Sequence, residues 1–501
     1  MFTPRRLQAI TKLVLAAIFA IGFTSITAPE SLATGTQQSE CVVGTSACPA
    51  MSPQEIFNLY GTTTDGTYYI YDNGVSQQVY LKMSRTGTSG GSWVLMMKAP
   101  QGSTTFVYGS GYFTSNSNTT GTLANDFTSD AKYAVYNDLP ITRALAVFAN
   151  PQAGTLPSGG DISSNGFGGW TWMETITSQS MYSRLSNNQD ILITSTPTTS
   201  LRTSLWNDGT NAIFSNQAGY GIYGFNRTTA CNSKNYRWGI IWNNESAADS
   251  CDTYVGIGLI GSSAGDLPSW NGINVAYNQA TSNGYNGGLG NFAFQLWGKM
   301  ADPSLATPQS LVTNSATPGV LGISWSAPAA TTPTEYVVQY KPTATSGWST
   351  ANTFRVTSPG ATPSANISGL TGGTSYDVRV WARTSSDSSA SPLTGSASTT
   401  STTSVSLSLP GNATSTIFRN NVQITANVQA VGKVKFMEQG HPIPGCKAVI
   451  STASSATCSW RPSIRNYIYL QAVFTPNAGS GLNGSTSSKL FVQVARRTGN
   501  R

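Results

Sequence analysis

The residues of this chain that are best suited to chemistry lie between Cys231 and Asp266. Two cysteines bracket an apolar, aromatic run that ends at Trp242. The oxygen-bearing side chains around this run are Asn243, Asn244, Glu245, Asp252 and Asp266. Carboxylate and amide oxygens are the ligands that a hard cation such as calcium prefers, and amides beside aromatic rings also suit sugar hydroxyls. The stretch therefore predicts a binding site, with Asn243, Asp252 and Asp266 as its metal ligands.

A capped strand end accounts for the same residues without any ligand. Asn and Asp commonly serve turns through hydrogen bonds to the nearby backbone, and Glu245 can extend into water. The residues alone leave both interpretations open. A second acidic pair, Asp126 and Asp130, favours surface solvation over metal binding.

The element that must position this site is a buried strand, predicted from the apolar, aromatic run Trp238, Ile240, Ile241 and Trp242. We expect a disulfide to hold the strand's flanks. The six cysteines form three close pairs, and sequential pairing keeps each bridge within one module: Cys41 with Cys48, Cys231 with Cys251, and Cys446 with Cys458. Zinc is a poor alternative, because the chain has no CxxC pattern and a single histidine, His441.

The N-terminus indicates export. Arg5, Arg6 and Lys12 precede an apolar run and a small-residue cleavage site at Ala33, which predicts a signal peptide over residues 1–33. That run is too short to cross a membrane, and no later segment is a candidate transmembrane span. We expect a secreted protein that is extracellular or loosely associated with the cell wall, which agrees with disulfide bonding.

With 501 residues, of which 10% are charged, the chain predicts several β-rich modules. A polar leader occupies 34–50, and Ser52, Pro53 and Glu55 then mark the start of a short helix. Leu321, Ile323 and Trp325 alternate with small residues, as do later runs, which predicts β-sandwiches. The boundaries we expect are a head at 51–300, a first sandwich at 308–396, a flexible Ser/Thr linker at 397–404 and a second sandwich at 405–496.

Several motifs of the head resemble a fibrinogen-like domain, in particular the intelectin branch of animal lectins. They are DGTYYIYDNG (65–74), VYLKM (79–83), GGSWVLMMK (90–98), RWGIIWNNE (237–245), GIGL (256–259) and SAGD (263–266). The resemblance implies an irregular α+β head in which bound calcium coordinates sugar hydroxyls. It assigns the sugar contacts to Asn244 and Glu245 and offers Trp270 and Tyr285 as aromatic walls. Lys82 stands at a cysteine position of the family, so the family's N-terminal disulfide is absent or rewired.

The other two modules carry resemblances of their own. The early Trp325, and Leu370 six residues before Tyr376, resemble a fibronectin type III domain with its tyrosine corner. GKVKFMEQGHPIPGC and YIYLQAVFTP resemble bacterial Ig-like repeats of secreted and surface proteins. The fold class that follows is mainly β with some α: an irregular α+β fibrinogen-like head followed by two β-sandwiches. This order of modules is typical of a secreted bacterial adhesion or binding protein.

The charge of the chain is unevenly distributed. From Ser404 onward ten Lys and Arg residues oppose one acid, Glu438, which gives +9, whereas the whole chain carries +7. Such a module attracts anionic polymers, so we expect anionic cell-wall polymers as partners of the C-terminal module and cell-surface or wall glycans as partners of the head. No basic recognition helix or RNA-binding strand accompanies the charge, which argues against nucleic acid.

Little in the sequence favours an enzyme. A single histidine excludes most nucleophile–base arrangements, and neither a Walker pattern nor an HExxH pattern is present. We therefore expect a non-enzymatic, carbohydrate-binding adhesion protein. Two alternatives stay open: a structural surface protein without a ligand, and a glycoside hydrolase whose carboxylate pair is unrecognised.

Overall fold

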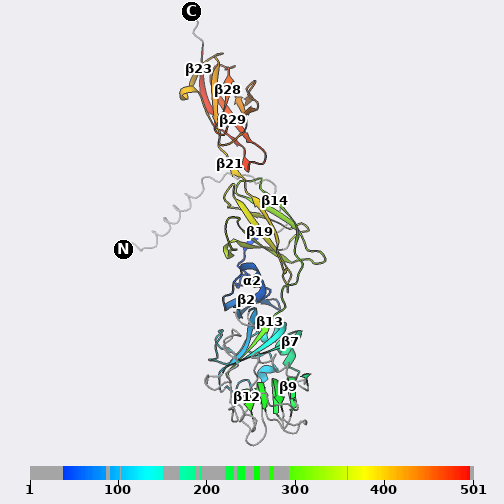
Figure 1. The fold of residues 1–501 in the computed structure, drawn as a ribbon. Helices are drawn as coiled ribbons and strands as arrows, with labels where there is room; N and C mark the ends of the chain where they lie inside the picture. Colours follow the sequence, from blue (N-terminus) through cyan, green and yellow to red (C-terminus); the bar gives the residue numbers. More distant parts are fainter. Residues whose placement is uncertain are drawn as a thin grey trace, which may run out of the picture.

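A computed structural model describes residues 38–85, 91–101, 103–149, 170–187, 191–194, 221–230, 234–242, 253–259, 270–275, 293–357 and 359–496. Three bodies follow one another along an elongated molecule (Figure 1). We call them the head (residues 41–300), the middle sandwich (305–398, joined by residues 38–40) and the C-terminal sandwich (401–496). The fold class is mainly β with few helices, as the sequence predicts.

The head combines two sheets with short helices. Its strands are β2 (Gly66–Asp72), β3 (Val75–Lys82), β4 (Trp93–Ala99), β5 (Ala131–Lys132), β6 (Ile141–Ala149), β7 (Trp170–Gln179), β8 (Ile191–Thr194), β9 (Gly221–Ala230), β10 (Lys234–Trp242), β11 (Thr253–Leu259), β12 (Trp270–Val275) and β13 (Ala293–Lys299). Its helices are α2 (Pro53–Tyr60), η1 (Gly111–Phe113), α3 (Val135–Asp138) and α4 (Met181–Leu185). One sheet has the order β2-β3-β4-β13-β6-β7, and the other has the order β12-β11-β10-β9-β8.

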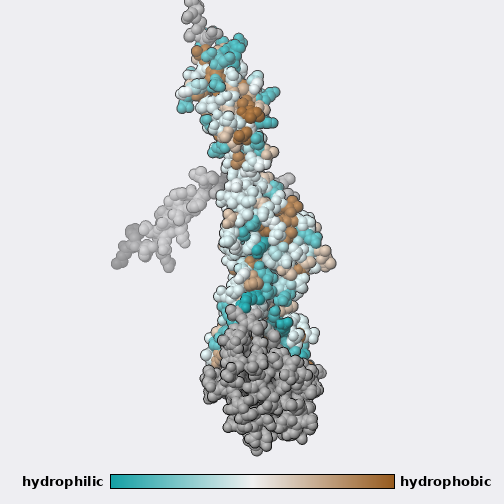
Figure 2. All heavy atoms as spheres, viewed as in Figure 1, coloured by the Kyte–Doolittle hydropathy of each residue, from teal (hydrophilic) through white to brown (hydrophobic). Residues whose placement is uncertain are grey.

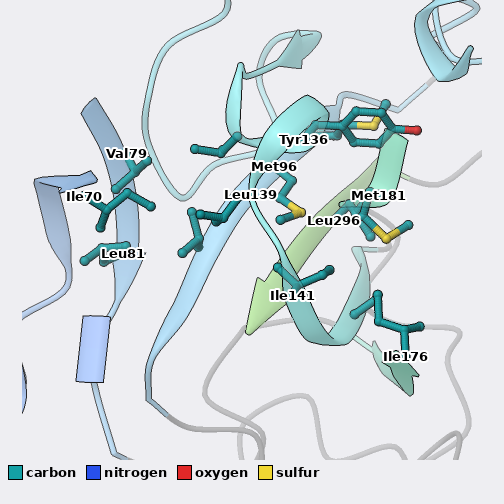
Figure 3. Packing of buried hydrophobic residues seen from close by; sticks show 14 of the residues in the cluster. Ile70, Val79, Leu81, Met96, Tyr136, Leu139, Ile141, Ile176, Met181 and Leu296 are labelled. Atoms are coloured by element: carbon teal, nitrogen blue, oxygen red, sulfur yellow. The ribbon is translucent and has the colours of Figure 1, made fainter. Parts of the chain in front are cut away.

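The core of the head lies against the first sheet. Strand β4 is buried at every position because it is central in that sheet and is covered on both faces. Side chains from β2 and β3 meet Tyr136 and Leu139 of the α3 region and Met181 of α4 in one apolar layer (Figure 3). The predicted strand forms as β10, and Trp238 within it is 1% exposed and stacks on Phe225.

Helix α2 begins where its sequence predicts. The side chain of Ser52 accepts a hydrogen bond from the backbone N–H of Glu55, and Pro53 occupies the first turn. Gly61 ends the helix in the left-handed conformation, with φ of 66°, which glycine adopts without strain. Ile56 and Leu59 are both buried, as expected for the apolar face.

Lys82, which stands where the resembling family has a cysteine, forms an ion pair with Asp65. Its ammonium lies 2.6 Å from Asp65, whose other carboxylate oxygen accepts hydrogen bonds from the backbone of Met83 and Ser84. The nearby cysteines pair with each other, Cys41 with Cys48, as predicted.

The middle sandwich has two sheets. Its elements are β14 (Gln309–Asn314), β15 (Leu321–Ser326), β16 (Glu335–Pro342), η4 (Thr350–Asn352), β17 (Thr353–Thr357), β18 (Ser364–Ile367), β19 (Ser375–Arg383), β20 (Leu393–Ser398) and an added strand, β1 (Gln38–Glu40). The sheets are β14-β15-β18 and β1-β17-β16-β19-β20. The predicted alternation is confirmed at Leu321, Ile323 and Trp325, which are buried. The hydroxyl of Tyr376 accepts a hydrogen bond from the backbone N–H of Thr371, as a tyrosine corner requires.

The C-terminal sandwich also has two sheets, β22-β24-β28 and β23-β32-β29-β25-β26. Its elements are β21 (Ser401–Thr402), β22 (Ser406–Ser408), η5 (Pro410–Asn412), β23 (Ser415–Ile417), β24 (Val422–Asn427), β25 (Gly432–Glu438), β26 (His441–Pro442), β27 (Val449–Ile450), β28 (Ser455–Trp460), β29 (Asn466–Pro476), β30 (Leu482–Asn483), β31 (Ser485–Thr486) and β32 (Leu490–Ala495). The predicted bridge between Cys446 and Cys458 is formed beside the buried Trp460.

Two connecting segments have more structure than the sequence predicts. The segment expected to be a polar leader, 34–50, supplies β1 from residue 38 and buries Val43 and Ala50 in the core of the head. The segment expected to be a flexible linker, 397–404, contains β21, and Thr399 and Thr403 within it are buried. Both segments gain their order from hydrogen bonds to strands that are remote in the sequence.

Other predictions fall on parts of the chain that are not described. The signal peptide (1–33) lies outside the described residues, and so do Cys231, Cys251 and two arginines of the basic tail, Arg497 and Arg501. Within the described part of the chain, none of the helices combines the length and the apolarity that crossing a membrane requires.

Candidate functional site

Most residues of the predicted calcium and sugar site fall in the sequence between β10 and β11. The antiparallel register pairs Trp242, the last residue of β10, with Thr253, the first residue of β11. The loop between these paired positions contains most of the predicted site. The residues that lie outside the described part of the chain are Asn243, Asn244, Glu245, Asp252, Asp266 and Tyr285. The calcium and sugar roles of these residues stay predictions.

Trp270, the other residue proposed as an aromatic wall, has a described backbone. It begins β12 and pairs with Leu259, whereas Val275 at the other end of β12 pairs with Thr253. The backbone of Trp270 therefore lies at the opposite end of β11 from Thr253, about 20 Å away along the strand at roughly 3.3 Å per residue.

Asp126 and Asp130 make structural contacts. The carboxylate of Asp126 lies 2.7 Å from the ammonium of the fully buried Lys98. That of Asp130 accepts hydrogen bonds from Ser103 and Thr105. Their oxygens are thus engaged in contacts within the fold in addition to any exposure to water.

The most extensively built polar arrangement in the described structure joins the head to the middle sandwich. On the outer face of the middle sandwich, the register places Glu335 opposite Arg383 and Val337 opposite Trp381. Alternation predicts that this face is exposed to water, yet Arg383 is 1% exposed and Trp381 is 3% exposed. Helix α2 of the head lies over this end of the sandwich (Figure 1).

An ion-pair cluster holds the covered face. The guanidinium of Arg383 donates to both carboxylate oxygens of Glu55 at 2.6 and 2.9 Å, and its third nitrogen lies 2.9 Å from Glu335. Glu55 is itself 1% exposed and also accepts a hydrogen bond from the backbone N–H of Met51. Burial alone lowers the pKa of Arg383, but the two carboxylates raise it above its ordinary value, so the guanidinium stays charged.

Backbone contacts reinforce the same junction. Strand β1 pairs with β17 and so covers an edge of the middle sandwich. The side-chain amide of Gln339 donates to the carbonyl of Leu59 at the end of α2. Val337 and Trp381 belong to the same apolar cluster as the core of the head. The head and the middle sandwich therefore form a single packed unit.

An open groove of about 520 Å³ lies where α2 ends on the middle sandwich. Its wall on the head side comes from Phe57 to Gly61, and its other wall comes from the loop before η4 and from the strands β19 and β20. The aromatic residues in its lining are Phe57, Tyr60, Trp348 and Trp381, and Arg379 lines it as well.

Arg379 is the single charged residue among those that line the groove. Its guanidinium lies 3.9 Å from the centre of the Trp348 ring and, within the described part of the chain, makes no hydrogen bond or ion pair. Burial lowers the pKa of Arg379 from its ordinary value, and Asp377 opposes that shift. Asp377 instead pairs with Lys341 at 3.0 Å. Among the described residues, the groove thus offers aromatic surface and an unpaired cation, with no carboxylate, histidine or cysteine in its lining.

The sequence analysis missed this groove, although two signals for it exist. Trp348 lies in a Ser/Gly-rich turn, SGWST, where a large aromatic residue is unusual without a partner. Trp381 and Arg379 occupy the outward positions of β19, because Tyr376, Val378 and Val380 face inward. An outward tryptophan on a sandwich strand indicates that another surface covers or contacts it.

Comparison with known proteins identifies the middle sandwich. The family model for the fibronectin type III domain matches residues 306–396. An FN3 domain of human collagen XX is 25% identical, and the match covers 20% of this chain and 99% of that one, with a TM-score of 0.17. The FN5 domain of Drosophila Lar is 18% identical, with coverage of 19% and 97% and a TM-score of 0.15. No curated protein matches the chain. Fibronectin type III domains are structural or adhesion modules and are typically not enzymes.

Proposed function

We propose that this protein is a secreted, non-enzymatic adhesion protein that binds carbohydrate at the unit formed by its head and middle sandwich. The observation that carries the proposal is the groove beside α2. Its aromatic rings suit the apolar faces of sugar rings, and the unpaired guanidinium of Arg379 suits a hydroxyl or carboxylate substituent. A fibronectin type III domain and two disulfides agree with an extracellular location.

The groove favours binding over hydrolysis. A glycoside hydrolase of the common type needs two carboxyl groups that flank the scissile bond. The residues that line the groove supply none. The second route to carbohydrate, calcium held by the 243–252 loop and Asp266, is implied by the resemblance of the head to intelectins. It is a separate proposal that can fail while the groove binds.

The test is a glycan array with the mature full-length chain, measured with and without a calcium chelator. We expect binding that persists in chelator, and we expect Trp348→Ala or Arg379→Gln to weaken it about tenfold, since a central aromatic or arginine contact is commonly worth more than 1 kcal/mol. Arg355→Gln is the matched control. It removes the same charge from β17, a strand of the same sheet that lies outside the groove.

Each outcome separates the candidates. Binding that chelator abolishes and that Trp348→Ala leaves unchanged would assign recognition to the head loops. Equal losses in Arg379→Gln and Arg355→Gln would reduce the groove to a general charge effect. A folded chain that binds no glycan in either condition would favour the structural alternative.

A further inference from the structure

The outer face of the larger sheet in the C-terminal sandwich carries aromatic side chains in water. Along β29, Ile468, Leu470 and Ala472 are buried, so Tyr467 and Tyr469 point away from the core. Tyr467 is 73% exposed and Phe491 of the neighbouring strand is 63% exposed. Hydrophobic side chains are visible on the surface of this sandwich among hydrophilic ones (Figure 2).

The strand register places these rings side by side. Tyr469 pairs with Phe491, and their ring centres lie 6.4 Å apart in an edge-to-face arrangement. Tyr467 pairs with Gln493, whose amide therefore lies next to the ring on the same face. We call Tyr467, Tyr469, Phe491 and Gln493 the aromatic platform. Rings and amides on a flat sheet face can contact several successive sugar units of an extended chain.

One cation contacts the aromatic platform and two more lie on the same sheet. The ammonium of Lys489 lies 4.3 Å from the ring centre of Tyr469. Lys433 and Lys435 are exposed on the outward side of β25, where the register pairs Lys435 with Val473, four residues along β29 from Tyr469. The one acid of this module, Glu438, accepts hydrogen bonds from Ser463. The platform therefore attracts anions, in a module whose residues from Ser404 sum to +9.

The same charges disfavour a second copy of the chain as the occupant. A twofold interface built on this face would bring one set of lysines against its own copy, and like charges in contact oppose association. An anionic partner meets no such penalty. Exposed rings contribute little to folding, and an exposed apolar patch on a folded protein commonly marks a site of interaction.

We propose that the aromatic platform is a second binding site, independent of the groove, for an anionic polysaccharide. Sugar rings stack on Tyr467 and Phe491, Gln493 bonds hydroxyl groups, and Lys435 and Lys489 pair with the carboxylates or phosphates along the polymer. The site would hold the C-terminal end of the protein on a charged wall polymer while the head unit stays free to bind elsewhere.

The experiment measures binding of the mature full-length chain to polygalacturonate, with neutral dextran and polyglutamate as comparison polymers. The double variant Tyr467→Ala with Phe491→Ala should weaken polygalacturonate binding at least about tenfold, and Tyr467→Phe, which keeps the ring, should retain most of it. Val312→Ala, which truncates a side chain 61% exposed on the middle sandwich, is the matched control and should change nothing. Thermal unfolding verifies that each variant is folded.

Charge variants complete the test. Lys489→Gln should weaken binding more than Lys447→Gln, which removes the same charge from the connection between β26 and β27. Equal losses in these two variants, or polyglutamate binding as tight as polygalacturonate binding, would overturn the platform in favour of general attraction. Unchanged affinity in the aromatic double variant would also overturn it. So would a concentration-dependent dimer that this variant abolishes, because the face would then belong to a second copy.

Discussion

The two junctions of this molecule are built in different ways. Between the head and the middle sandwich, Arg383 and Glu55 are buried, β1 crosses to the partner module, and Trp381 joins the core of the head. Between the middle and C-terminal sandwiches, the contacts are polar and near the surface. The side-chain amide of Asn483 donates to the carbonyl of Ala316 of the middle sandwich.

The cores follow the same division. The apolar cluster of the C-terminal sandwich contains residues of that module alone, from Val405 to Val494. The cluster of the head includes Val337 and Trp381 of the middle sandwich. Shared buried apolar area couples the unfolding of the parts that it joins. The head and the middle sandwich should therefore unfold together as one unit. The second junction should act as a hinge between that unit and the C-terminal sandwich, which should be stable independently of each other.

The largest expected effect comes from removing the buried cation of the first junction. Arg383→Met leaves Glu55 buried without its partner, which should cost about 3–5 kcal/mol in the free energy of unfolding. Arg355→Met is the control, because Arg355 is one-third exposed and lies 3.9 Å from the same acid, Glu335. It should cost less than about 1 kcal/mol. Denaturant unfolding monitored at the head measures both, and similar losses in the two variants would contradict a rigid first junction.

The disulfides distinguish the two units. Cys41→Ser opens a short loop at the first junction, and Cys446→Ser opens one inside the C-terminal sandwich. Each should cost about 3 kcal/mol in the chain-entropy model. Calorimetry should show that Cys41→Ser lowers the transition of the head and middle sandwich, whereas Cys446→Ser lowers a separate transition. A single transition that responds to both variants would mean that the second junction is rigid too.

Asp72 of the head tests whether a buried carboxylate with an unsatisfied oxygen lowers the stability of the fold. It is 6% exposed, and within the described part of the chain its Oδ1 accepts no hydrogen bond. Burial, together with Asp138, raises the pKa of Asp72 from 3.8 to about 6. Between these two pH values the folded state holds a proton on Asp72 that the unfolded state has released. The contribution of protonated Asp72 to the stability of the fold is therefore complete below about pH 3.8 and is lost as the pH rises through about 6.

Asp72→Asn should therefore stabilise the head at pH 8 by at most about 3 kcal/mol, at about 1.4 kcal/mol per unit of pKa. At pH 3.5 it should change little. The measurement is the unfolding temperature of the variant and the native chain at both pH values. A stabilisation of equal size at pH 3.5 and pH 8 would show that the charge of Asp72 is not its cause.

The smallest effect is expected at the second junction. Asn483→Ala removes the exposed hydrogen bond to Ala316, which should change the free energy of unfolding by about 1 kcal/mol or less. Small-angle scattering should show a wider range of overall lengths in this variant, while Gln339→Ala at the first junction should leave the range unchanged. A loss of several kcal/mol in Asn483→Ala would show that the two junctions are alike.

The sequence by itself determined the local features of this protein. The cap of α2 depends on Ser52, Pro53 and Gly61, whose effects act within a few residues. The alternation of Leu321, Ile323 and Trp325 defines a sandwich strand wherever it is placed. Cysteines close in sequence pair locally, at Cys41–Cys48 and Cys446–Cys458. The sugar-binding roles predicted for Asn244 and Glu245 still rest on the sequence and its resemblance to intelectins alone.

The tertiary structure alone decided what the outward faces do. Alternation assigns Arg383, Trp381, Arg379 and Tyr467 to outward positions without distinction. The head then covers the first two, leaves Arg379 beside a groove, and lies far along the molecule from Tyr467 (Figure 1). Strand β1 likewise has no pattern that names its partner, because the ladder is made by backbone groups that every residue carries. Which surfaces meet depends on the placement of whole modules, and local periodicity contains no information about that placement.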